Sequence, residues 1–166
     1  AEVLVPGMTH LQHGQPIRLG HAFAAHGWAL ARDLERIAGA KARALESMPL
    51  GSAALGGTTL SLDLAVLAKE LGFQGPSLNS YDSVGDRDFL LEAIDAFASC
   101  AVHLSRLAED MIIWSSTAIG LVKLPPDWST GSSIMPNKRN PDVPELVRGK
   151  SAHIIGAAAN AHALLK

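Results

Sequence analysis

Two long stretches of this sequence carry apolar side chains at helical spacing, and that pattern constrains the fold more than any other feature. The first stretch covers 16–47, with Pro16 suited to the first helical turn because it needs no amide partner there. Its apolar positions are Phe23, Leu30, Leu34, Ile37 and Leu45, with charged residues on the other face. At about 1.5 Å per residue this helix would be roughly 45 Å long. A compact chain of 166 residues cannot cover such a helix by itself.

The second long stretch follows a shorter predicted helix. The short helix covers 62–71 and is closed by Gly72, a typical residue at a helix end. Ser83 and Asp86 then have the spacing of a capping box, in which two side chains satisfy the free amides of a helix start. Apolar residues at helical spacing follow them as far as Ile112. We therefore expect a second long helix that begins at this box.

A long loop separates the second long helix from the last one. The loop covers 115–141 and is rich in Ser, Thr, Gly and Pro, a composition typical of functional or mobile loops. The last helix is expected to begin with Asp142 as its cap and to tolerate Pro144 in its first turn. No segment shows a convincing strand pattern. The sequence thus predicts an all-α fold, a long-helix bundle that forms one helical unit over 1–166.

The predicted helices leave apolar faces without partners. Their apolar residues occupy more than one stripe, and small residues that allow close helix approach are frequent, as in HAFAAHGWALA and GAAANAHALL. Two or three helices cannot bury several faces among themselves, so we expect partner helices from other copies of the chain. The alternative is a monomeric bundle in which the alanines only support helix propensity.

Composition narrows the class of protein. There are 14 Lys and Arg against 16 Asp and Glu, and no long run of one sign, so a nucleic-acid surface is not indicated. The single cysteine, Cys100, fits an ordinary buried thiol in a reducing cytoplasmic compartment. Apolar runs are shorter than a bilayer span. The chain opens without Met and ends at Lys166 in a helical pattern, so a fragment is expected.

The segment 131–141, GSSIMPNKRNP, has the composition of an anion-binding loop. Lys138 and Arg139 could bind carboxylates, and Asn140 could orient one of them by a hydrogen bond. A serine such as Ser132 becomes a base when a nearby cation stabilises its alkoxide. The alternative from composition alone is a solvated loop with a helix-capping asparagine.

A second polar cluster lies at 6–16, PGMTHLQHGQP. It contains Thr9, His10, His13 and Gln15 just before the first long helix. A histidine near its ordinary pKa of about 6.5 can donate or accept a proton at neutral pH, and a carboxylate partner would orient it. The remaining histidines fit packing or surface roles in helical patterns: His21, His26, His103, His153 and His162.

A third cluster lies at 78–89, LNSYDSVGDRDF. Helix caps, first-turn acids and an Arg–Asp pair explain most of its residues, which include Asn79, Asp86 and Arg87. The histidines are too scattered for a metal site, and the chain has no phosphate-binding GxxxxGK motif.

Together these motifs resemble the fumarase/aspartase superfamily of lyases, whose mobile loop reads roughly GSSxMPxKxNP. The segments that carry the resemblance are PGMTHLQHGQP, LGSAALGGTT, LNSYDSVGDRDF, HLSRLAEDMIIWSS and STGSSIMPNKRNPDVPELVRGK. They cover nearly the whole chain and are most similar to the argininosuccinate lyase branch. Adenylosuccinate lyase or another fumarate-releasing member is the alternative, as is a non-catalytic relative like the lens crystallins built on this scaffold.

The resemblance implies an elimination that releases fumarate from a succinyl compound. By motif position Ser132 is the catalytic residue of the mobile loop, favoured here as the base, and His10 is the second acid/base group. Glu145 is the expected carboxylate partner of His10, although Pro144 is unusual beside it. The substrate-binding residues would be Thr9, Gln15, Ser133, Lys138 and Asn140.

The resemblance also implies an assembly. Central helices of this superfamily form a homotetramer in which each active site takes segments from three subunits, so His10 and Ser132 would meet across a subunit boundary. No metal and no organic cofactor is implied, and the expected ligand is a small molecule. The family's N- and C-terminal regions lie outside these residues, so the chain is expected to be a central helical domain that is inactive in isolation.

Overall fold

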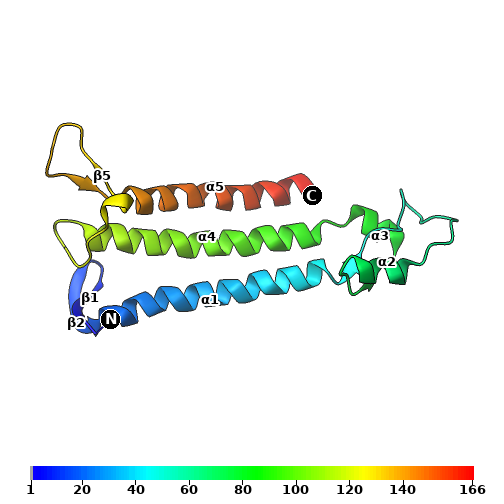
Figure 1. The fold of residues 1–166 in the computed structure, drawn as a ribbon, viewed down its shortest axis with the longest axis horizontal. Coiled ribbons are helices and arrows are strands. Elements are labelled where there is room, and N and C mark those ends of the chain that lie inside the picture. The colour runs from blue at the N-terminus through cyan, green and yellow to red at the C-terminus, as the bar shows by residue number, and fades with distance from the viewer. Residues whose placement is uncertain (1) are drawn as a thin grey trace. The chain divides into compact units, whose positions relative to one another are not determined.

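The computed structural model describes residues 2–166, and the chain divides into two compact units. Unit 1 consists of Ala1–Asp33 and Ala98–Ala157, and unit 2 of Leu34–Phe97 and Ala158–Lys166. Three long helices contribute residues to both units: α1 (Leu19–Ala44), α4 (Asp88–Ser115) and α5 (Asp142–Leu165) (Figure 1). The predicted all-α, long-helix class is confirmed, since these helices hold most of the ordered secondary structure.

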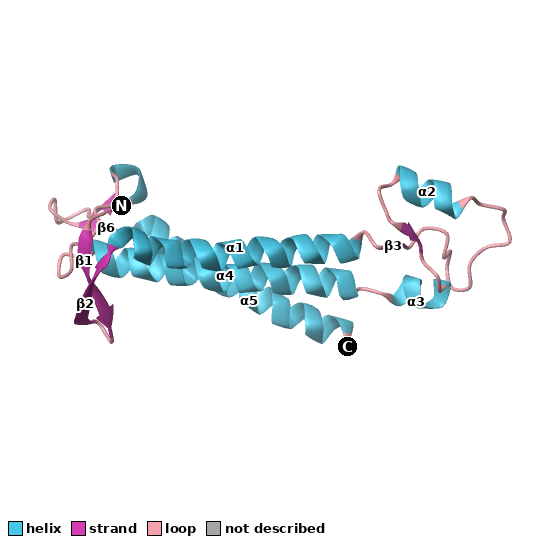
Figure 2. Ribbon diagram, turned by 90° about the horizontal axis from the view of Figure 1, so that it is seen from below, coloured by secondary structure: helices cyan, strands magenta, loops and turns pink. Residues whose placement is uncertain are grey.

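Besides its portions of the three long helices, unit 1 contains short strands. The strands β1 (Leu4–Thr9) and β2 (Gln12–Arg18) form an antiparallel hairpin directly before α1. A 3₁₀ helix, η1 (Pro126–Trp128), precedes a second antiparallel pair, β5 (Thr130–Gly131) with β6 (Arg139–Asn140). Figure 2 shows these strands at one end of the helices of unit 1. That end therefore carries two of the three polar segments singled out in the sequence, 6–16 and 131–141.

Small residues and two His–Asp pairs join the helices of unit 1. Ala29 of α1 and Ala101 and Ala108 of α4 are buried, which lets the helices approach closely. The pairs are His26 Nε2 to Asp110 Oδ2 at 2.9 Å and His103 Nδ1 to Asp33 Oδ2 at 2.7 Å. Both connect α1 with α4. Arg148 on α5 donates to Glu109 on α4 at 2.8 Å, so α4 has polar links to both of its neighbours.

Asp33 also affects the single cysteine. Burial, followed by the charge of the Asp33 carboxylate, raises the pKa of the Cys100 thiol. A raised pKa keeps the thiol protonated at neutral pH, and a protonated thiol is a poor nucleophile. Cys100 was expected to be an ordinary buried thiol, and the structure leaves it half-buried.

Unit 2 is built around a buried methionine. Met48 of β3 (Ser47–Met48) is fully buried, and β3 pairs in parallel with β4 (Gly75–Pro76). Two short helices complete the unit, α2 (Leu64–Glu70) and α3 (Ser80–Gly85). Asp63 caps α2 by accepting from Val66 N at 3.0 Å, and Gly72 follows its end at φ 82°. The predicted short helix closed by Gly72 is confirmed.

Two pairs of polar side chains connect helices within unit 2. His162 of α5 lies 3.0 Å from Asp95 of α4, with both side chains 51% exposed. Arg43 of α1 donates from Nε to Glu92 of α4 at 2.6 Å, and this hydrogen bond lowers the pKa of Glu92 below its ordinary value. The Arg43–Glu92 hydrogen bond therefore contributes to folding stability above the ordinary pKa of a glutamate. This contribution is lost as the pH falls through the lowered pKa of Glu92. Because both pairs are exposed, each contributes little to stability.

The expectation that no strands are present was wrong for three short strand pairs, the longest of them at the N-terminal end, and α1 begins at Leu19 instead of Pro16. Val5 pairs with Ile17, and these are the least exposed residues of their strands. Pro6 pairs with Pro16 on a two-stranded ribbon, which tolerates prolines because each strand has a free edge. The prolines and glycines break the period-2 alternation by which a strand is usually recognised.

The expected capping box was also wrong. Ser83 lies inside α3, which is capped by Asn79 accepting from Tyr81 N and Asp82 N at 3.0 Å each. Asp86 accepts from Asp88 N at 2.7 Å, so it closes the turn into α4 from outside that helix. Two helices, α3 and α4, begin within a few residues of each other here. The spacing of Ser83 and Asp86 led to the prediction of a single helix start.

The last helix begins at Asp142 as predicted, with Pro144 buried in its first turn. Among residues 2–166, none of the helices is both long enough and apolar enough to cross a membrane.

We expect the buried His103–Asp33 pair to matter more than the exposed His162–Asp95 pair. Asp33 is 1% exposed, so His103→Ala removes a donor from a carboxylate that water cannot reach. The free energy of unfolding should fall by about 2 kcal/mol. The matched variant His162→Ala should lower it by less than about 1 kcal/mol. Urea unfolding followed by circular dichroism measures both, and equal losses would contradict the role given to burial.

Candidate functional site

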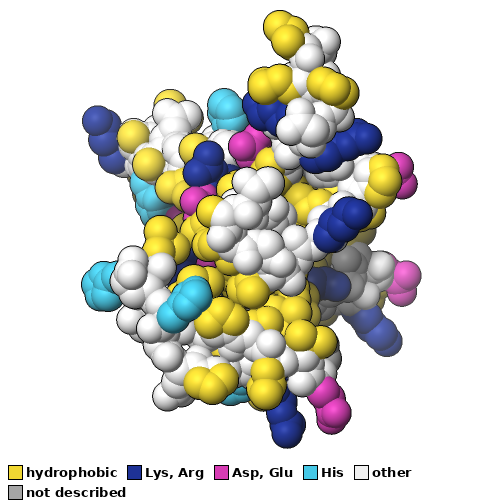
Figure 3. All heavy atoms as spheres, turned by 90° about the vertical axis from the view of Figure 1, so that its left-hand side faces the viewer, with side chains coloured by type: hydrophobic (Ala, Val, Ile, Leu, Met, Phe, Trp, Pro, Cys, Tyr) yellow, Lys and Arg dark blue, Asp and Glu magenta, His cyan; other side chains and the backbone are white. Residues whose placement is uncertain are grey.

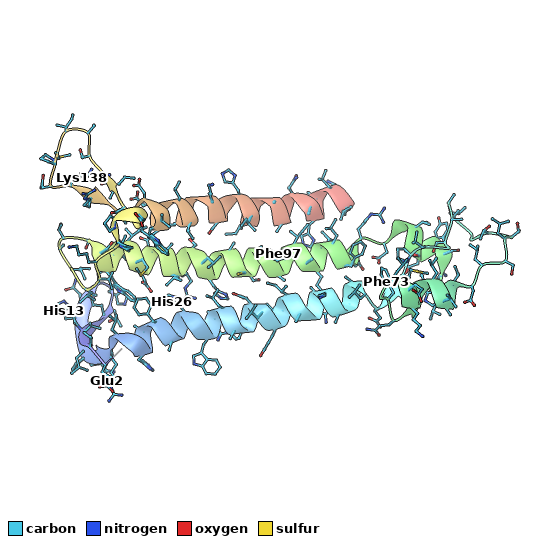
Figure 4. All side chains as sticks on the ribbon, viewed as in Figure 1. Glu2, His13, His26, Phe73, Phe97 and Lys138 are labelled. Atoms are coloured by element: carbon cyan, nitrogen blue, oxygen red, sulfur yellow. The ribbon has the colours of Figure 1, made fainter. Side chains whose placement is uncertain are left out.

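The loop 131–141 is held at both ends. Thr130 pairs with Asn140 and Gly131 with Arg139 in the β5–β6 ladder, and the Thr130 hydroxyl donates to the Asp142 carboxylate at the start of α5. Between these anchors the loop is exposed, with Ile134 86% accessible. The segment is thus a loop that projects from the end of unit 1, with its two ends anchored and its tip exposed to solvent. Figure 4 shows Lys138 on this loop.

Ser132 lies just after the anchored base, and its oxygen accepts two backbone hydrogen bonds. The donors are Ile134 N at 3.3 Å and Met135 N at 3.1 Å. Amide groups directed at a hydroxyl oxygen also stabilise negative charge that develops on it, because their dipoles are already oriented. The loop therefore gives Ser132 a local environment that favours the loss of its proton.

A cavity of about 750 Å³ lies between this loop and the ends of α4 and α5. Lys138, Asn140 and Glu145, three of the residues predicted from sequence, line it together with Arg139. Ser132 and Ser133 lie outside this lining. Lys123 adds a third cation to the wall, where Glu145 is the only carboxylate. The excess of positive charge suits a ligand with more than one negative group.

Sequence reasoning missed part of this wall. Ser115, Ser116 and Thr117 also line the cavity, although Ser115 and Ser116 both donate to backbone carbonyls of α4. The signal available in the sequence was the run of hydroxyl residues directly after the last apolar residues of the second long stretch. It was interpreted only as the beginning of a loop.

The β1–β2 hairpin presents the second predicted group of residues. Thr9, His10 and Gln15 are all exposed, and Thr9 pairs with Gln12 to close the hairpin. A bulge interrupts the ladder between Pro6 and Met8. Gly7 occupies it, and a Cβ there would lie 2.9 Å from the Gln15 carbonyl oxygen, a distance that real Cβ atoms do not reach. Only glycine fits this position without a shift of the backbone that carries Gln15.

His10 lines a different cavity, of about 470 Å³, between the hairpin and the facing sides of α1 and α4. The His26–Asp110 pair, Arg32 and Arg106 also line it. Figure 4 shows His26 directed between α1 and α4. Since Glu145 lines the other cavity, one chain does not bring His10 and Glu145 into a common cavity. Figure 3 shows histidine and cationic side chains on the face of unit 1 that carries the hairpin and the loop.

The third polar cluster acts as local structure. Asn79 and Asp86 accept from backbone amides at the two helix starts, and the Arg87 guanidinium donates to the Val84 carbonyl at 3.4 Å. Within residues 2–166, the structure contains no group of three or more His, Cys, Asp or Glu side chains placed to hold a metal ion.

Comparison with known proteins agrees with these motifs. A curated argininosuccinate lyase from Herpetosiphon aurantiacus is 51% identical over 165 residues, which is 99% of this chain and 36% of that protein. The chain thus spans about a third of the length of this relative.

Solved structures give the same fold. A crystal structure of EDDS lyase in complex with formate matches 98% of this chain and 32% of its own, with a TM-score of 0.92 and 33% identity. A fumarate lyase:delta crystallin from Brucella melitensis matches 99% of this chain and 37% of its own, with a TM-score of 0.80 and 26% identity.

The family model described as "Lyase" matches residues 1–156, which include nearly the whole of the two helical units and all three polar segments. The resemblance to the fumarase/aspartase superfamily is confirmed, and the chain belongs to this lyase family.

Proposed function

We propose that this chain is the central helical domain of an argininosuccinate lyase, which splits argininosuccinate into arginine and fumarate. The 51% identity to a curated enzyme of that name, running over 99% of the chain, carries the proposal. The cation-rich cavity beside the loop supports it, because the substrate carries several carboxylates. We also propose a cytoplasmic location, in keeping with the single cysteine.

In the proposed mechanism Ser132 removes a proton from the carbon beside one succinate carboxylate. Two negative charges then build up on that carboxylate as its aci form, and this charge is the main barrier to the reaction. Lys138 and Asn140, which line the cavity beside the loop, bind the succinate part. In the proposal the Lys138 ammonium stabilises both the carboxylate and the Ser132 alkoxide. Two amide donors already directed at Ser132 Oγ support this choice of base.

The second half of the reaction breaks the carbon–nitrogen bond. The electron pair of that bond leaves with nitrogen, and His10 supplies the proton that the nitrogen requires. Glu145 orients and polarises His10, while Thr9, Gln15 and Ser133 complete the binding of substrate. Arginine and fumarate are then released, with the carbon proton on Ser132 returned to solvent.

These roles require more than one copy of the chain. His10 and Glu145 line separate cavities here, so we propose that a homotetramer joins the hairpin of one subunit with the loop of another. Uncovered apolar side chains on the helices support the assembly. In unit 1 they include Trp28 at 70% exposure and Ile154 at 43%, and in unit 2 Leu34 at 69% and Phe97 at 52%.

The first test is Ser132→Ala in the full-length protein. Loss of the base should lower kcat for fumarate release by at least about 10²-fold, the usual effect of removing one acid/base group. The matched control Ser61→Ala lies in an exposed loop of unit 2 and should keep native activity. Light scattering should give the same mass for all three proteins. Near-native turnover by Ser132→Ala would contradict the assignment of the base.

A substrate panel tests the choice within the superfamily. The full-length protein should release fumarate from argininosuccinate, and not from adenylosuccinate or malate. Preference for either of the other compounds would assign it to a different branch. No turnover of any of the three compounds would support the non-catalytic, crystallin-like alternative. The similarity to the Brucella melitensis fumarate lyase:delta crystallin is the observation that favours this alternative.

A mixing experiment tests the shared sites. His10→Ala and Ser132→Ala proteins should each be inactive, but tetramers reassembled from both should regain activity, because some sites then combine a native hairpin with a native loop. Each variant unfolded and refolded alone is the control. If the mixture stays inactive while native protein survives the same treatment, the two residues act within one subunit.

A further inference from the structure

The turn of the β1–β2 hairpin has an unusual backbone. The ladder ends at Thr9 and Gln12, so the turn consists of His10 and Leu11 alone. Both residues lie in the left-handed region, with φ 53° for His10 and 58° for Leu11. A two-residue turn with both φ angles positive matches the twist of the strands, and it is normally built from Asn and Gly.

Leu11 is the less expected of these two residues. Histidine is among the residues enriched in left-handed backbone, and its place here follows from the acid/base role proposed above. Leucine is not enriched, because its Cβ crowds the following carbonyl oxygen in this conformation. Leu11 is also 62% exposed, so burial of its side chain offsets little of this strain. Glycine would fit the same backbone at lower cost.

The hairpin gives the strain no simple way to relax. The bulge at Gly7 has no space for a side chain, and the paired Pro6 and Pro16 have fixed φ angles. His10 and Leu11 line the same cavity, which the apolar residues Ile113, Trp114 and Leu121 also line. The Leu11 side chain therefore borders this cavity together with the imidazole that precedes it in the turn.

We propose that Leu11 is a positioning residue for His10. Its side chain limits the orientations of the imidazole and excludes water from one side of it, and the chain accepts a strained turn to place an apolar group there. The inference rests on the proposed function, since it assigns Leu11 to the proton transfer made by His10.

The test compares Leu11→Gly with Leu11→Met in the full-length protein. Glycine relieves the strain but removes the side chain, so the Tm of Leu11→Gly should equal or exceed that of the native protein while kcat falls about tenfold and KM changes less than twofold. Methionine restores an apolar side chain of similar volume, and kcat should return to within about threefold of native. The control Leu4→Gly, on ordinary backbone of the same hairpin, should lower Tm and leave kcat unchanged.

Three results would overturn the inference. The first is a native kcat in Leu11→Gly, and the second is a lowered Tm in that variant. The third is a fall of kcat in Leu11→Met as large as the fall in Leu11→Gly. A native protein that releases no fumarate from argininosuccinate would defeat the proposed function and this inference with it. A fully active native protein with an equally active Leu11→Gly variant defeats the inference alone.

Discussion

The buried contact between Asp33 and His103 is the interaction on which the arrangement of unit 1 depends. The helices meet mainly through alanines, which allow close approach but bury little apolar surface and define helix rotation only weakly. A buried carboxylate needs hydrogen-bond donors, and the 2.7 Å contact with His103 supplies one that joins α1 to α4. The His26–Asp110 pair also joins α1 to α4, at a position nearer to the hairpin. These polar pairs therefore fix the relative rotation of the two helices, which a small apolar core defines only weakly.

That fixed helix pair carries two very different polar segments at the same end of unit 1. The hairpin that holds His10 is rigid, because a glycine-only bulge and opposed prolines restrict its backbone. The loop that holds Ser132 is anchored only at its base and is open at its tip. In the proposed mechanism, an acid on a restrained hairpin and a base on an open, exposed loop suit a reaction in which substrate must enter before water is excluded. The two cavities of one chain divide these functions between them.

Much of the fold could be predicted from particular residues. Apolar periodicity located the long helices, Gly72 marked the end of α2, and Asp142 marked the start of α5. The hairpin was missed because Pro16 serves equally well in a first helical turn and on the free edge of a two-stranded ribbon. The start of α4 was misplaced because Ser83 has the right spacing from Asp86 but lies inside a separate short helix. In the first case pairing across the hairpin selected the strand, and in the second the Asn79 cap of α3 and the Asp86 turn into α4 separated two helix starts.

The sequence by itself determined the chemical content of this protein: its long helices, the serine and cations of the loop, and the histidine that precedes the first helix. Residue types and spacing are sufficient for that, because helix periodicity and side-chain chemistry are local properties. Only the tertiary structure decided that Asn140 and Glu145 share a cavity while His10 lines another, and that His10 is carried on a strained turn. Such placement depends on strand register and helix packing, which are set by contacts between residues far apart in the chain.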